Sequence, residues 1–223
     1  MGTLLVCTGL LSSIEEASAD ERDALRILFL GDSLTAGYGV APEEAYPALL
    51  AQRIEQANLP FAVQNAGVSG DTTAGGLRRL SWLLRQPVAV LVLALGANDG
   101  LRGLNLTATE ENLRAIIERA REKNPNIRIV LAGMLVPPNM GEEYAKQFRA
   151  LYHRVAEKEQ TALVPFLLES VAAEPGLNLA DGIHPNPEGY KLVANNVWQH
   201  LEPVLRELQA QTNSSAETEL QAN

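Results

Sequence analysis

Residues 88–95 read Val-Ala-Val-Leu-Val-Leu-Ala-Leu, and the chain continues directly into Gly96-Ala97-Asn98-Asp99-Gly100. A strand that is covered by helices on both faces has no polar face, so an almost unbroken apolar run is typical of a central strand in a parallel sheet. Glycine and short polar residues after such a run mark a loop. We therefore expect a buried central strand here, with a polar loop at its carboxyl end.

On both sides of this strand in the sequence, short apolar runs alternate with longer amphipathic stretches, which is typical of parallel strands joined by crossover helices. The five expected strands are residues 26–30, 61–65, 88–95, 127–132 and 162–166. Apolar residues recur at helical spacing in residues 46–57, 113–120 and 144–155. The capping-box pattern Thr107-x-x-Glu110 precedes the second of these stretches. A last helix is expected to begin with Asn186 as its cap and Pro187 in its first turn. The pattern predicts an α/β fold, a three-layer α/β/α sandwich around a five-stranded parallel sheet.

Composition limits the possible functions. Of 223 residues, 46% are hydrophobic and 20% charged, which fits one globular domain. The 18 Lys and Arg residues against 27 Asp and Glu residues give a formal charge of −9, so nucleic acid would be repelled and is not an expected partner. With Cys7 as the single cysteine and no Cys/His cluster at zinc-ligand spacing, the sequence predicts neither a disulfide scaffold nor a structural zinc site.

The two ends of the chain are expected to lie outside a folded domain of residues 25–206. Residues 1–24 hold the apolar run 4–11 and the tripeptide Ala17-Ser18-Ala19, which are features of a cleaved signal peptide, although no Lys or Arg precedes the run. This segment predicts a periplasmic or secreted protein, or a cytoplasmic one if it does not work as a signal. The polar composition of residues 207–223 predicts a disordered tail.

The loops after the strands contain the candidate functional residues. In open parallel sheets the ligand site lies outside the carboxyl ends of the strands, where the strand order reverses. With the order 2-1-3-4-5 of flavodoxin-like folds, strands two, one and three are neighbours about 4.8 Å apart. Ser33 follows strand one and is then flanked by Gly67, after strand two, and Asn98, after strand three.

These residues supply the parts of an acyl-transfer site. A serine hydroxyl needs a base within hydrogen-bond reach, and the base needs an orienting group. His184 is the candidate base for Ser33, and Asp181, three residues earlier, can hold the imidazole in the required tautomer. The backbone N–H groups of Ser33 and Gly67 and the side-chain amide of Asn98 are the candidate oxyanion-hole donors.

Four ordered blocks resemble those of the SGNH, or GDSL-type, serine hydrolases: Gly31-Asp32-Ser33-Leu34, Gly67, Gly96-x-Asn98-Asp99 and Asp181-x-x-His184. The similarity covers about residues 27–205. Within the family, residues 31–39, 98–103 and 181–186 are most similar to the bacterial multifunctional thioesterase I, lysophospholipase and arylesterase group. The resemblance implies hydrolysis of carboxylic esters and thioesters through an acyl-serine intermediate, without a metal or organic cofactor, usually in the periplasm or outside the cell.

The sequence excludes two other chemistries and leaves two alternatives open. No Lys follows the glycines of the Gly31 loop, which excludes a Walker A phosphate cradle, and Gly31-Asp32-Ser33-Leu34-Thr35 is not the Gly-x-Ser-x-Gly elbow of α/β-hydrolases. The apolar segments 101–106 and 134–140 favour a groove for medium-to-long acyl chains. A small-acyl carbohydrate esterase and a non-enzymatic flavodoxin-like binding module remain open. The expected partner is a small ester or thioester, bound by a monomer without stable membrane insertion.

Overall fold

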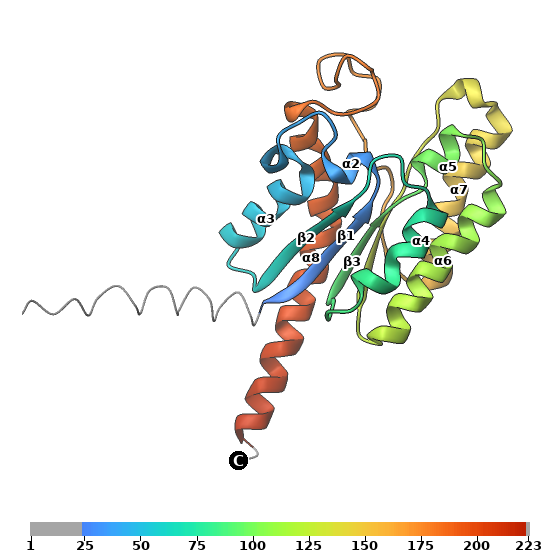
Figure 1. Ribbon diagram of the computed structural model, residues 1–223. Helices are drawn as coiled ribbons and strands as arrows, with labels where there is room; N and C mark the ends of the chain where they lie inside the picture. Colours follow the sequence, from blue (N-terminus) through green and yellow to red (C-terminus); the bar gives the residue numbers. More distant parts are fainter. Residues whose placement is uncertain (1–23, 222–223) are drawn as a thin grey trace, which may run out of the picture.

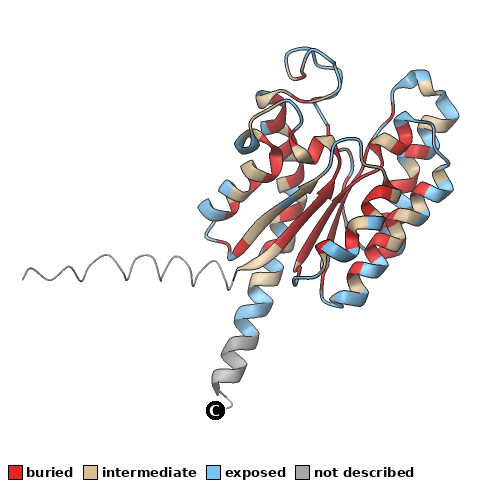
Figure 2. Cartoon of the chain, viewed as in Figure 1, coloured by how far each residue is buried: buried red, intermediate tan, exposed pale blue. Residues whose placement is uncertain are grey.

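The computed structural model describes residues 24–221 and contains a parallel sheet in the order β2-β1-β3-β4-β5, as the sequence predicts. Its strands are β1 (Leu25–Gly31), β2 (Phe61–Gly67), β3 (Val90–Ala94), β4 (Arg128–Ala132) and β5 (Ala162–Val164). Every residue of β3 is buried, and Figure 2 shows the buried positions concentrated along the central strands. Residues 1–23 of the expected signal segment lie outside the described residues.

Helices cover both faces of the sheet and complete the predicted three-layer sandwich (Figure 1). One face carries α3 (Tyr46–Gln56) and α8 (Pro187–Gln221), and the other carries α4 (Thr73–Leu83), α6 (Leu106–Lys123) and α7 (Glu142–Glu159). The connections hold the short helices α2 (Ser33–Ala36) and α5 (Ala97–Leu101) and the 3-10 helices η1 (Pro42–Glu44) and η2 (Pro138–Met140). Helix α2 begins two residues after β1 ends, and α5 begins three residues after β3 ends, so both bring polar side chains to the carboxyl edge of the sheet.

The strand register sets the geometry of that edge. Gly31, the last residue of β1, pairs with Gly67 on β2 and with Ala94 on β3. The three central loops therefore leave the sheet at the same level and meet above its carboxyl edge.

Two helix caps test the sequence analysis. Asn186 caps α8, because its Oδ1 accepts a hydrogen bond from the Gly189 N–H at 3.0 Å, as predicted. The capping box at Thr107 was wrong: the N-cap of α6 is Asn105, two residues earlier, and its side chain accepts from the Ala108 N–H at 3.0 Å. Asn is at least as good an N-cap as Thr, so the earlier start is favoured.

The C-terminal segment also differs from expectation. A disordered tail was predicted from residue 207, whereas α8 continues to Gln221. Glu207 and Gln211 accept hydrogen bonds from Arg128 at 2.9 and 3.2 Å. Leu, Gln, Glu and Ala are good helix formers, so a helix already nucleated by packing extends at little cost. No helix within residues 24–221, α8 included, is long and apolar enough to cross a lipid bilayer.

Candidate active site

A chain of hydrogen bonds joins three of the side chains singled out from the sequence. Ser33 is the first residue of α2, directly beyond β1, and its Oγ lies 2.9 Å from Nε2 of His184. Nδ1 of the same imidazole lies 2.7 Å from Oδ2 of Asp181. This is the geometry in which an imidazole can take a proton from a hydroxyl while a carboxylate holds the ring in place.

The loop before α8 carries both Asp181 and His184 and is closed on itself. Leu179 donates its N–H to the His184 carbonyl at 2.7 Å, and Asn178 forms an antiparallel bridge with Pro185. The buried Asn178 amide also donates to the Val171 carbonyl at 2.7 Å, which fixes the loop to the preceding segment. His184 is thus held by backbone and side-chain bonds although it lies outside the sheet.

Asp181 is held in its ionised form. Its Oδ1 accepts the backbone N–H groups of Ile183 and His184 at 2.9 and 3.0 Å. The bond from the His184 backbone, followed by those from Ile183 and the His184 ring, lowers the pKa of Asp181 to about 2. The carboxylate can therefore accept the Nδ1–H of the His184 ring, an orientation that directs Nε2 toward Ser33.

Tyr38 is a site residue that the sequence reasoning missed. Its ring lies over the His184 imidazole, with ring centroids 4.5 Å apart and planes inclined by 41°. The Tyr38 side chain is 51% exposed, so it covers the imidazole from the solvent side rather than filling the core. The available signal was an aromatic residue between two glycines in the Ser33 loop, Gly37 and Gly39.

The expected oxyanion donors lie next to the Ser33 segment. The Ser33 N–H is at the first position of α2 and so has no acceptor within the helix. The Gly67 N–H donates to Oδ1 of Asn65 at 2.9 Å, and the side-chain amide of Asn98 donates to the Asp71 carbonyl at 2.9 Å. An oxyanion at this place would accept the Gly67 N–H together with Asn65 Oδ1 or in its place.

Gly67 has a steric reason to be glycine. A Cβ at this position would overlap the backbone nitrogen of Ala36 in α2. Without it, the end of β2 and the helix that begins with Ser33 come into close contact. The approach of these two segments brings the Gly67 backbone to the nucleophile.

Asp32 is a buried carboxyl beside the site. It is 2% exposed, and its Oδ1 caps α2 by accepting the Leu34 N–H at 3.0 Å. Its Oδ2 lies 3.3 Å from the amide nitrogen of Asn98. Burial raises the pKa of Asp32 to about 6, although the Leu34 bond and the nearby His184 act in the opposite direction.

Arg79, from α4, ties the strand ends together and was not identified from the sequence. Its guanidinium donates to the carbonyl oxygens of Gly31 and Ala66 at 3.0 and 2.7 Å and pairs with Asp71 at 2.7 Å. These bonds satisfy carbonyl groups at the ends of β1 and β2. The arginine therefore stabilises the edge of the sheet from which the Ser33 and Gly67 loops emerge.

Comparisons with known proteins show the family of this chain. The GDSL-like lipase/acylhydrolase family model matches residues 29–192. The chain belongs to this family. Esterase TesA of Pseudomonas aeruginosa is 38% identical over 200 residues, which cover 89% of this chain and 96% of that protein. Thioesterase 1/protease 1/lysophospholipase L1 of Escherichia coli K12 is 39% identical over 181 residues, covering 80% and 84%.

A solved structure of an esterase supports the assignment of this acylhydrolase to its family. The psychrotrophic esterase EstA from Pseudoalteromonas sp., in a structure inhibited by monoethylphosphonate, superposes with a TM-score of 0.76 at 32% identity. The match covers 81% of this chain and 98% of that one.

Exposed apolar side chains of this GDSL-family acylhydrolase gather near the site. Large hydrophobic residues exposed in the described chain, apart from Trp82, lie in the segments that follow the strands, with Leu101 at the end of α5: Tyr38, Val68, Leu101, Leu104, Leu135 and Ile183. The described residues contain no group of three or more His, Cys, Asp or Glu side chains arranged to hold a metal ion.

Proposed function

We propose that this enzyme hydrolyses carboxylic esters and thioesters of medium-to-long acyl chains through an acyl-serine intermediate. The observation that carries the proposal is the hydrogen-bonded chain from Ser33 Oγ through His184 to Asp181. Membership of the acylhydrolase family and the names of its relatives, an esterase and a thioesterase, support the same reaction class.

In the first half of the reaction, His184 Nε2 takes the Ser33 hydroxyl proton as Oγ attacks the acyl carbon. The carbonyl oxygen becomes an oxyanion, which accepts hydrogen bonds from the N–H groups of Ser33 and Gly67 and from the Asn98 amide. His184 then gives its proton to the leaving alcohol or thiol as the C–O or C–S bond breaks.

Water completes the cycle. It loses a proton to His184 while its oxygen attacks the acyl-serine, and the second oxyanion uses the same donors. His184 returns the proton to Ser33 Oγ as the carboxylic acid leaves. Asp181 keeps its charge throughout and stabilises the imidazolium that forms in each half.

The acyl chain is expected to lie across the apolar loops after β3 and β4. Leu101, Leu104 and Leu135 are 43%, 41% and 36% exposed, and burying them under a hydrocarbon chain would be favourable. A small-acyl carbohydrate esterase would instead need a polar cleft with aromatic platforms, and Tyr38 is already engaged with His184. A flavodoxin-like binding module would have no need for a base in contact with a serine.

Two measurements test the proposal. A 4-nitrophenyl alkylphosphonate should label Ser33 stoichiometrically, and Ser33→Ala should take up no label; absence of label on the wild-type enzyme would contradict the acyl-serine route. Rates with 4-nitrophenyl esters from C2 to C16 and with acyl-CoA then define the acyl specificity. A maximum at C2 would favour the carbohydrate esterase.

We also propose that the enzyme is exported and acts as a monomer. Support comes from the apolar run 4–11 and the Ala17-Ser18-Ala19 tripeptide, which match a signal peptide and its cleavage site. N-terminal sequencing of protein recovered from the periplasm should begin close after residue 19. A full-length protein retained in the cytoplasm would contradict export, and sedimentation at twice the mass of one chain would contradict the monomer.

A further inference from the structure

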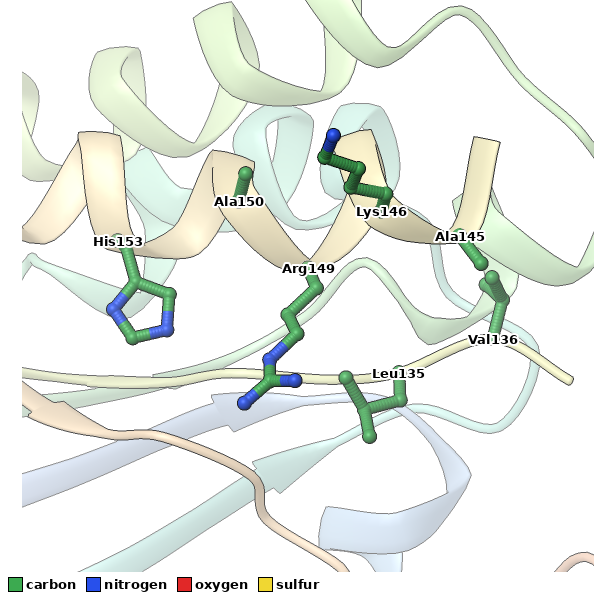
Figure 3. A pocket seen from close by; sticks show the side chains of 7 residues that line it. All are labelled: Leu135, Val136, Ala145, Lys146, Arg149, Ala150 and His153. Carbon is green, nitrogen blue, oxygen red and sulfur yellow. The ribbon is translucent and has the colours of Figure 1, made fainter. Parts of the chain in front are cut away.

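A groove of 480 Å³ lies between α7 and the loop that follows β4. Its apolar wall consists of Leu135, Val136, Ala145 and Ala150, and its polar wall consists of Lys146, Arg149 and His153. Figure 3 shows Arg149 and His153 extending from α7 on the side where Leu135 lies. This volume is within the range of small-molecule sites.

The charge of the groove contrasts with that of the chain. The protein carries a formal charge of −9, yet none of the described residues that line the groove is acidic. Glu142 and Glu157 flank the groove along α7, one helical turn before Lys146 and one turn after His153, but neither lines it.

The two cations have no partners of their own. Among residues 24–221, the side chains of Lys146 and Arg149 make no hydrogen bond or ion pair, whereas Arg154 on the same helix is paired with Glu110. Lys146 and Arg149 are exposed and so free to bind an anion.

The groove adjoins the segment after β3, which carries Asn98. Val136 packs so closely on α5 that a Cβ on Gly100 would stand 2.5 Å from its methyl group, and Gly100 lies two residues after Asn98. Tyr144 precedes Ala145 of the groove lining, and its hydroxyl donates to the Leu104 carbonyl at 3.1 Å. β4 lies two strands from β1, on the order of 10 Å away. A substrate held at Ser33 could therefore extend into the groove.

We propose that the groove binds an anionic group, a phosphate or carboxylate, carried by the substrate at a distance from the ester bond. The proposal rests on the ester hydrolysis proposed above and adds to it a binding site for the anionic part of the substrate. Leu135 and the two alanines contact the hydrocarbon part, while Lys146 and Arg149 bind the anion. Arg149 can bind two oxygens at once and Lys146 adds a point charge.

Matched substrate pairs test this site. One pair is 1-lauroylglycerol and 1-lauroylglycerol 3-phosphate, which places the anion on the alcohol side. The other is 4-nitrophenyl decanoate and the mono-4-nitrophenyl ester of sebacic acid, which places it at the far end of the acyl chain. The variants are Lys146→Gln and Arg149→Gln, with Lys158→Gln as control, because Lys158 is exposed on the same helix but does not line the groove.

We expect each groove variant to raise KM for at least one anionic substrate about fivefold, with kcat and the neutral partner unchanged. The pair that responds identifies the side that carries the anion, and Lys158→Gln should behave as wild type. Equal effects on anionic and neutral esters, or no effect on either pair, would overturn the proposal.

A binding measurement separates this proposal from the proposed function. Dodecyl phosphate should bind the wild-type enzyme by calorimetry, with Kd about fivefold higher for Arg149→Gln. If no ester is hydrolysed but this difference is found, ester hydrolysis fails and the anion site stands. If neutral esters are hydrolysed but Kd is the same in both proteins, the anion site alone is wrong.

Discussion

Asp32 gives a prediction whose size can be worked out from the structure. Asp32 is the residue before the nucleophile Ser33. Its carboxyl is 2% exposed and lies 3.3 Å from the Asn98 amide nitrogen. Asn is nearly isosteric with Asp and can still accept the Leu34 N–H at the start of α2. The substitution Asp32→Asn therefore removes the titration while keeping the cap.

The sign follows from proton linkage. Burial raises the pKa of Asp32 from 3.8 in the unfolded chain to about 6 in the folded enzyme, so the folded state binds the proton more tightly. The resulting stability is fully present below pH 3.8 and is lost as the pH rises through 6. A difference of about 2 units corresponds to about 3 kcal/mol.

The assay is urea unfolding of both proteins at pH 3.5, 5 and 8. Asn does not titrate, so any pH-independent cost of the substitution cancels when the difference between the two proteins is compared across pH. Relative to wild type, Asp32→Asn should gain about 3 kcal/mol between pH 3.5 and pH 8, with most of the change between pH 4 and 6. A difference that stays constant within about 0.5 kcal/mol, which is the precision of such measurements, would refute the reasoning.

Three further substitutions test the site. Gly67→Ala places a Cβ against the Ala36 backbone and should lower the free energy of unfolding by about 1–3 kcal/mol in urea, whereas Gly176→Ala, where a Cβ meets nothing within 4 Å, should not; equal stability of the two variants would contradict the contact. Tyr38→Ala should lower kcat about threefold to fivefold and alter the pH profile of kcat/KM, because the imidazolium of His184 loses its contact with the aromatic ring. Tyr38→Phe keeps the ring and should restore both. A Phe variant as impaired as the Ala variant would show that the hydroxyl matters instead. Asn98→Ala should lower kcat about 10²-fold in stopped or continuous ester assays through loss of one oxyanion donor, and wild-type turnover would remove Asn98 from that role.

The sequence was sufficient for the sheet because its signals are local. An apolar run such as 88–95 identifies a central strand by itself, and alternation of strands with helices predicts a parallel sheet. The order 2-1-3-4-5 was taken from flavodoxin-like folds, and the structure has it. The end of α8 was less predictable: residues 207–221 have a polar composition, but a helix continues through them because it has already formed upstream. Polarity alone does not distinguish a solvated helix from a disordered tail.

The parts of the site that escaped prediction depend on contacts between distant segments. Arg79 lies in α4, and nothing near it in the sequence indicates that it binds the Gly31 carbonyl 48 residues away. The ring of Tyr38 meets His184 only because the loop before α8 folds back over the Ser33 segment. Likewise, the bond between Asn65 and the Gly67 N–H depends on a side-chain conformation that no sequence pattern specifies.

The length of α8 has a practical consequence for presenting the enzyme on a support. The helix starts at Pro187, three residues after His184, and its 35 residues span about 52 Å. It runs past the opposite edge of the sheet, so the end of α8 lies far from the Ser33 loops (Figure 1). A tether attached there would hold the enzyme with its substrate entrance facing the solution, and immobilisation through the C-terminus should leave access for bulky or aggregated esters unobstructed.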